Sequence, residues 1–221
     1  MFRIKICGVT TVDDACAAVQ LGAEMIGLNF YAKSPRYVSP EQAQVIAAEI
    51  PQTTGVFVNA SAEEINGIAK SVGLDWVQLH GDEPPELLAD LRSDLPIIRV
   101  RCLDERGVGA IADDLEACRT RGREPAAYLV DATVPGQYGG TGKTADWAAL
   151  KNYRDWLGEI PLILAGGLIA ENVAEAIAVV RPDAVDTASG VESEPGVKDA
   201  GKMQTFCEAS AAAFGKEDVL P

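Results

Sequence analysis

Short runs of apolar and β-branched residues recur along the chain at intervals typical of alternating strands and helices. Several of these runs are continuously apolar instead of alternating between apolar and polar, which is typical of parallel strands that are covered on both faces. The predicted strands are residues 3–7, 25–30, 54–59, 76–80, 97–101, 127–131, 162–165 and 184–187.

Segments with apolar residues at helical spacing follow each predicted strand. The predicted helices are residues 12–21, 40–50, 62–71, 84–91, 108–119, 145–156, 171–180 and 198–214. Two of them carry recognisable start signals. Ser39 stands directly before Pro40, and Ser61 is followed three residues later by Glu64, which is the pattern of a capping box.

Eight alternating strand and helix units, without a linker or a shift in composition, predict an α/β fold. The simplest arrangement is a single (β/α)8 TIM barrel that forms one domain over residues 1–221. A doubly wound open sheet is the alternative. That fold usually carries a glycine fingerprint after its first strand, whereas only Gly8 follows the first strand here.

Composition and charge narrow the classes of function. Of the 221 residues, 48% are hydrophobic and 24% charged, as in a globular domain with a sizeable core. The longest nearly apolar run, residues 160–170, is too short for a membrane span, and the N-terminus lacks the apolar stretch of a signal peptide. Five cysteines without Cys-x-x-Cys spacing indicate reduced thiols and a cytoplasmic protein. A net charge of -14 without a basic cluster argues against a nucleic-acid partner.

In a TIM barrel the chemistry lies at the carboxyl ends of the strands. Cys7 ends the first predicted strand, so its thiol is expected at the mouth, although a small buried hydrophobic role is the alternative. Asp131 ends the sixth strand and precedes a glycine-rich loop, residues 132–144. This composition suits a lid or a ligand-binding loop, and a solvated loop is the alternative.

Glycines and polar residues at other strand ends predict a site for a phosphorylated small molecule. Gly166-Gly167 follows the seventh strand and Ser189-Gly190 the eighth, where TIM barrels often bind phosphate, although ordinary turns use the same residues. Arg36 lies on a loop stiffened by a proline and could bind a carboxylate or lie on the surface. His80, at the end of the fourth strand, could polarise a substrate oxygen or only satisfy the strand end.

Six motifs in order along nearly the whole chain resemble those of the phosphoribosylanthranilate isomerase family. They are Lys5-Ile6-Cys7-Gly8, Ser34-Pro35-Arg36-Tyr37-Val38, Val77-Gln78-Leu79-His80-Gly81, Gly139-Gly140-Thr141-Gly142, Leu164-Ala165-Gly166-Gly167-Leu168 with Asn172-Val173, and Ser189-Gly190-Val191-Glu192 with Pro195-Gly196 and Lys198-Asp199. One departure lies at Ala188, where the family commonly has serine. It puts one phosphate contact in question, and not the site itself.

The resemblance implies an Amadori rearrangement of N-(5'-phosphoribosyl)anthranilate without a metal or organic cofactor. In this family's mechanism an acid protonates the furanose ring oxygen, and a base then removes a proton from the adjacent sugar carbon. The resemblance assigns Asp131 as the acid, Cys7 as the base and Arg36 as the ligand of the anthranilate carboxylate. It assigns Gly166, Gly167, Ser189 and Gly190 to the phosphate, and Asp186 or His80 to sugar hydroxyls.

Other functions on the same scaffold remain open from sequence. Indole-3-glycerol phosphate synthases bind a related sugar phosphate, but their chemistry uses a strand-end lysine, and none is predicted here. A sugar-phosphate epimerase would need more metal ligands than the single histidine offers. A catalytically silent metabolite-binding barrel would be expected to lack Cys7 or Asp131. The sequence leaves open whether the protein is a monomer or a homodimer, and whether it also acts on the related histidine-pathway substrate.

Overall fold

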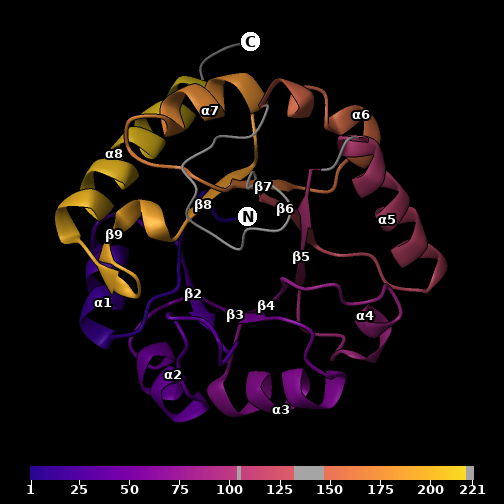
Figure 1. Ribbon diagram of the computed structural model, residues 1–221, viewed down its shortest axis with the longest axis horizontal. Coiled ribbons are helices and arrows are strands. Elements are labelled where there is room, and N and C mark those ends of the chain that lie inside the picture. Colours follow the sequence, from indigo (N-terminus) through magenta and orange to yellow (C-terminus); the bar gives the residue numbers. More distant parts are fainter. Residues whose placement is uncertain (104–105, 132–146, 218–221) are drawn as a thin grey trace.

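The computed structural model of the chain describes residues 1–103, 106–131 and 147–217. Eight parallel strands form a closed barrel in the order β1 to β8, with β1 paired to β8, and helices surround the barrel (Figure 1). The predicted (β/α)8 barrel is therefore confirmed. The barrel strands are β1 (Ile4–Cys7), β2 (Met25–Asn29), β3 (Thr53–Phe57), β4 (Trp76–Leu79), β5 (Ile97–Cys102), β6 (Ala127–Asp131), β7 (Leu162–Ala165) and β8 (Ala184–Thr187).

The helices differ widely in length. The α-helices are α1 (Val12–Gln20), α2 (Pro40–Ala47), α3 (Ala62–Val72), α4 (Leu87–Asp90), α5 (Val108–Thr120), α6 (Arg154–Leu157), α7 (Val173–Val180) and α8 (Ala200–Glu217). Two 3-10 helices, η1 (Trp147–Leu150) and η2 (Ser189–Val191), complete the helical elements of the described residues. In this part of the chain no helix combines the length and the apolar character needed to cross a membrane.

The predicted helix starts at Ser39 and Ser61 are confirmed. The Ser39 hydroxyl accepts a hydrogen bond from the Gln42 backbone N–H, and the Gln42 side chain accepts one from the Ser39 N–H, which completes a capping box. Ser61 likewise accepts from the Glu64 N–H. These bonds satisfy N–H groups that have no partner within the helix.

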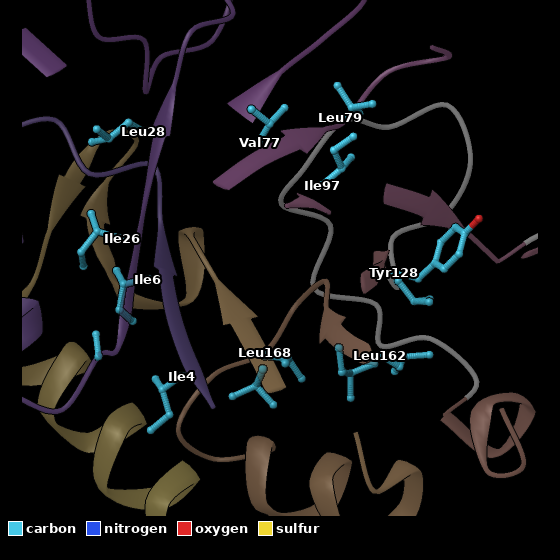
Figure 2. Packing of buried hydrophobic residues seen from close by; sticks show 14 of the residues in the cluster. Ile4, Ile6, Ile26, Leu28, Val77, Leu79, Ile97, Tyr128, Leu162 and Leu168 are labelled. Carbon is cyan, nitrogen blue, oxygen red and sulfur yellow. The ribbon is translucent and has the colours of Figure 1, made fainter. Parts of the chain in front are cut away.

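Two layers of side chains follow from the two-residue period of the strands. One layer lies between the barrel and its helices and includes Ile4, Ile6 and Tyr128, as Figure 2 shows. The other fills the barrel interior and includes Met25 and Leu129. Alternate residues therefore belong to different layers, and the position of a residue along its strand decides whether it faces the helices or the barrel axis.

Two predicted helices are reduced to about one turn of α-helix. Only Leu87–Asp90 is helical in the segment 84–91, and a turn in which Leu87 N–H donates to Pro84 O precedes it. Pro85 disfavours the helical conformation of the residue before it, so the helix cannot begin at Pro84. The segment 145–156 is not one helix. From residue 147 onward it is η1 followed by α6, and residues 145–146 lie outside the described part.

A short hairpin follows β8 and was not predicted from sequence. It consists of β9 (Glu192–Glu194) and β10 (Val197–Lys198), which pair antiparallel. The predicted start of the last helix at residue 198 is wrong as a result. Helix α8 begins at Ala200, after Asp199 accepts a hydrogen bond from the Lys202 N–H. In Figure 1 this hairpin, labelled β9, lies near α1.

Candidate active site

Three predicted site residues share the inward-facing positions at the carboxyl ends of their strands. On β1, Ile4 and Ile6 belong to the outer layer, so Cys7 alternates to the inside. The same alternation turns Asp131 inward at the end of β6 and Asp186 inward on β8. The barrel thus presents a thiol and two carboxylates toward one end of its axis.

The Cys7 thiol has a buried cation beside it. Lys5 lies two residues earlier on the same face of β1, and its Nζ donates to Asp186 Oδ1 at 2.9 Å across the β1–β8 pair. Burial raises the pKa of the Cys7 thiol, while the charges of Lys5 and Lys198 act in the opposite direction without outweighing it. Burial works to lower the pKa of Lys5, but the neighbouring Asp186 carboxylate and Cys7 raise it overall.

His80 follows β4 directly and connects a buried amide with Asp131. The Nδ1 atom of His80 lies 3.0 Å from Gln78 Nε2, and the Nε2 atom lies 3.8 Å from Asp131 Oδ2. With the amide donating, Nδ1 accepts and the ring proton is carried by Nε2, on the side of Asp131. Burial lowers the pKa of His80 despite the nearby carboxylate, which favours the neutral ring at pH 7.

The guanidinium of Arg36 is held by a carboxylate of the chain itself. Arg36 Nε and Nη2 each donate to one oxygen of Glu192, both at 2.7 Å. Glu192 also accepts from Lys198 Nζ at 2.9 Å. The stem of Arg36 lies across Gly8, because a Cβ at position 8 would collide with Arg36 Cδ. Arg36 therefore lies beside the end of β1, close to Cys7.

The glycines predicted for phosphate binding have backbone geometry that favours glycine. Gly166 and Gly167 have φ values of 87° and 68°, in the left-handed region. Gly190, in η2, has no room for a side chain, because a Cβ there would overlap Leu168 O and come within 2.6 Å of Thr187 Oγ1. These residues bring the loops after β7 and β8 together at one end of the barrel.

The structure also identifies residues whose importance sequence reasoning missed. Lys5, Gln78, Glu192 and Lys198 all stand in the motifs that resemble the family, but the sequence predicted no role for any of them. For Lys5 and Gln78 a signal existed: each is a polar residue at an inward-facing position of an otherwise apolar strand, and each is fully buried. The predicted loop of residues 132–144 lies outside the described residues. Among the described residues no cluster of three or more His, Cys, Asp or Glu could hold a metal ion.

A closed barrel with polar residues at the carboxyl ends of its strands is the architecture of (β/α)8-barrel enzymes, and this protein has that architecture. Residues 4–209 match the family model described as N-(5'phosphoribosyl)anthranilate (PRA) isomerase. The chain belongs to this isomerase family of tryptophan biosynthesis.

Individual relatives agree with that assignment. An N-(5'-phosphoribosyl)anthranilate isomerase of Pseudomonas putida is 46% identical over 94% of this chain and 96% of its own length. One from Geobacter sulfurreducens is 45% identical over 93% and 97%. The crystal structure of the Thermotoga maritima enzyme covers 96% of this chain and 100% of its own, with 41% identity and a TM-score of 0.85.

Proposed function

We propose that this protein converts N-(5'-phosphoribosyl)anthranilate to 1-(2-carboxyphenylamino)-1-deoxyribulose 5-phosphate, with Asp131 as general acid and Cys7 as general base. The observation that carries the proposal is the placement of both residues at inward-facing carboxyl ends of barrel strands. The rearrangement requires one proton donor and one proton acceptor, and these two residues supply them at the same end of the barrel.

The reaction is an internal redox change that needs no external electron acceptor. Asp131 gives its proton to the furanose ring oxygen, the bond from that oxygen to C1 breaks, and the nitrogen lone pair forms an iminium with C1. The iminium acidifies the proton on C2, which Cys7 removes, and the electron pair forms the enolamine. Proton loss from the C2 hydroxyl and protonation of C1 then give the ketone. C1 is reduced and C2 is oxidised.

The remaining predicted residues bind the two ends of the substrate in this proposal. Arg36 binds the carboxylate of the anthranilate ring, and Gly166, Gly167, Ser189 and Gly190 surround the phosphate. The glycine-only geometry after β7 and the close packing at Gly190 support a site that approaches its ligand with backbone atoms. A related structure was determined with reduced 1-(o-carboxyphenylamino)-1-deoxyribulose 5-phosphate, at 38% identity and a TM-score of 0.81.

The electrostatics of Cys7 add a pH dependence to the proposal. The base acts as thiolate, and burial raises the pKa of this thiol above its ordinary value of 9.0. The fraction of free enzyme with an ionised Cys7 therefore increases as pH rises. We expect kcat/KM to rise with pH between 7 and 9, because the ionised form of Cys7 is the active base.

The decisive experiment for the function is direct turnover. The purified protein should remove the fluorescence of N-(5'-phosphoribosyl)anthranilate. Because the product is an isomer of the same mass, it should be identified as the ketose by NMR, from its C2 carbonyl and its reduced C1. A barrel that only binds phosphorylated metabolites would leave the fluorescence unchanged, and an indole-3-glycerol phosphate synthase would act on the product instead. Either result would overturn the proposal.

The expected setting of the enzyme belongs to the same proposal. A cytoplasmic location is supported by Cys7, Cys16, Cys102, Cys118 and Cys207 being free thiols, because reduced cysteines are usual in that compartment. The partner is the phosphorylated substrate, and neither a nucleic acid nor a membrane is expected. The assembly we propose is a monomer or a homodimer, and one solved relative, 39% identical, is a monomeric form of a dimeric enzyme.

A further inference from the structure

The ion pair between Arg36 and Glu192 is part of a three-residue cluster. Glu192 accepts from Arg36 Nε and Nη2 at 2.7 Å and from Lys198 Nζ at 2.9 Å. The side chains of Glu192 and Lys198 are 4% and 0% exposed, whereas that of Arg36 is 21% exposed. The hydrogen bonds from Arg36 and Lys198 lower the pKa of Glu192 although burial acts to raise it, so this carboxylate is ionised at pH 7.

The hairpin β9–β10 holds this cluster against the loop that carries Arg36. Glu192 and Lys198 lie opposite each other in the antiparallel pair. Gly196, at the turn of the hairpin, lies so close to the loop that an added Cβ would be 2.7 Å from Pro35 O. The Thr10 hydroxyl donates to Gly196 O at 2.9 Å, which fixes the turn to the segment after β1. The turn of the hairpin therefore packs against the Arg36 loop, and β9 supplies the carboxylate that binds Arg36.

Lys198 also links the cluster to the catalytic strand. Besides Glu192, its ammonium donates to Cys7 O at 2.7 Å and to Ala188 O at 3.0 Å. All three N–H bonds of the ammonium are thus used. One buried lysine joins the ends of β1 and β8 to the carboxylate that holds Arg36.

The hydrogen bonds leave a defined part of the guanidinium available. Glu192 occupies Nε and one N–H of Nη2, on one edge of the planar group. Nη1 has no hydrogen-bond partner among the described residues, and it shares the neighbouring edge with the second N–H of Nη2. A second carboxylate can dock on that edge through two parallel hydrogen bonds.

We propose that Glu192, held by Lys198, is a positioning residue that orients Arg36 for the substrate carboxylate and so determines selectivity for a carboxylated ring. This inference rests on the proposed function and extends it to residues that do not touch the substrate. Two cations and one anion leave the cluster with a net charge of +1, so it still attracts an anionic ligand.

The substitution Glu192→Gln separates orientation from charge because the two act in opposite directions. It raises the net charge of the cluster from +1 to +2, which by attraction alone would tighten the binding of a carboxylate. It also weakens the hydrogen bonds that fix the Arg36 guanidinium. A mobile Arg36 side chain loses rotamer freedom when it binds a ligand, and this entropy loss lowers the affinity. If orientation dominates, affinity falls; if charge dominates, it rises.

The test compares two ligands that differ only in the ring carboxylate. The probes are reduced 1-(2-carboxyphenylamino)-1-deoxyribulose 5-phosphate and its phenylamino counterpart, with dissociation constants measured by calorimetry. We expect Glu192→Gln to weaken the binding of the carboxylated probe by about tenfold or more and the binding of the other probe by less than about threefold. In turnover, KM should rise more than kcat falls. Glu194→Gln is the matched control, because Glu194 lies on the same hairpin and is exposed. It should leave both constants unchanged.

A second variant keeps the proposal testable if Glu192→Gln does not fold. Glu192→Asp retains a charge near Lys198 but shortens the reach to Arg36 by one methylene, and it should give a smaller, still carboxylate-selective loss. Unchanged or tighter binding of the carboxylated probe, or equal weakening of both probes, would overturn the positioning role. If the wild-type protein does not distinguish the probes or turn over the substrate, the proposed function itself fails.

Discussion

Asp114, on α5, anchors this helix to the outer side of the barrel wall. Arg99 on β5 donates to its carboxylate from Nε at 2.6 Å and from Nη2 at 2.9 Å, and Arg101 Nη2 donates at 2.8 Å. The Tyr128 hydroxyl on β6 donates at 2.7 Å. Burial acts to raise the pKa of Asp114, but these hydrogen bonds and charges outweigh it and lower the pKa to about 2.

A pKa lowered on folding means that the folded protein is stabilised by the ionised form of Asp114. That contribution is complete well above the ordinary pKa of 3.8 and is lost as pH falls toward about 2. The difference between 3.8 and about 2 corresponds to about 2 kcal/mol at pH 7. About half of this stabilisation should be lost when the pH falls from 7 to 3.

Asp114→Asn keeps the shape of the side chain and removes its charge. Because it leaves Arg99, which is fully buried, without its carboxylate, we expect a loss of about 3–5 kcal/mol in the free energy of unfolding at pH 7. Urea unfolding at constant ionic strength from pH 7 to pH 3 measures this loss. The difference in the free energy of unfolding between wild type and Asp114→Asn should be about 1 kcal/mol smaller at pH 3 than at pH 7.

Asp113→Asn is the control, since Asp113 is the neighbouring residue on the same helix and its side chain is 77% exposed. It should change the free energy of unfolding by less than about 0.5 kcal/mol. If the two variants were equally stable at pH 7, or if the loss in Asp114→Asn did not depend on pH, the stabilising role of the ionised carboxylate would be refuted.

Three further predictions concern the site. Asp131→Asn should lower kcat/KM by about 10²–10⁴-fold with an unchanged melting temperature, and a retained rate in the fluorescence assay would move the acid role to another group. Arg36→Lys should raise KM more than it lowers kcat. It should weaken the binding of the carboxylated ligand by about 10- to 150-fold and hardly change the binding of an analogue without the carboxylate. Equal loss of affinity for both ligands would contradict the assignment of Arg36 to the carboxylate. Gly190→Ala should weaken competitive inhibition by inorganic phosphate, because its Cβ would overlap Leu168 O; unchanged inhibition would separate this loop from the phosphate.

The barrel could be predicted because its signals are local. Apolar runs, helical spacing and caps such as Ser39 depend on residues a few positions apart, and all eight predicted strands are present. The sequence also placed Cys7 and Asp131 at strand ends, and in the barrel the two-residue period turns both side chains inward. The family could be recognised from sequence because its motifs are short runs of residues in a fixed order along the chain.

The contacts that organise the site could not be predicted, because they join distant parts of the chain. Arg36 and Glu192 are 156 positions apart, and Lys5 and Asp186 are 181 apart. The hairpin containing Glu192 was missed because its strands, of three and two residues, are too short to show a period. The sequence predicted that Arg36 binds a substrate carboxylate or lies on the surface, and no local pattern indicated that it pairs with a carboxylate of the chain itself.

Cys7→Ala tests most directly whether Cys7 removes the substrate proton. Loss of the thiol should lower kcat by about 10²–10⁴-fold, while the dissociation constant of the reduced product analogue stays nearly unchanged, because a general base acts in the transition state more than in binding. Cys16→Ala, a thiol on α1 outside the site, should behave like wild type. A loss of kcat smaller than about tenfold in Cys7→Ala would contradict the account.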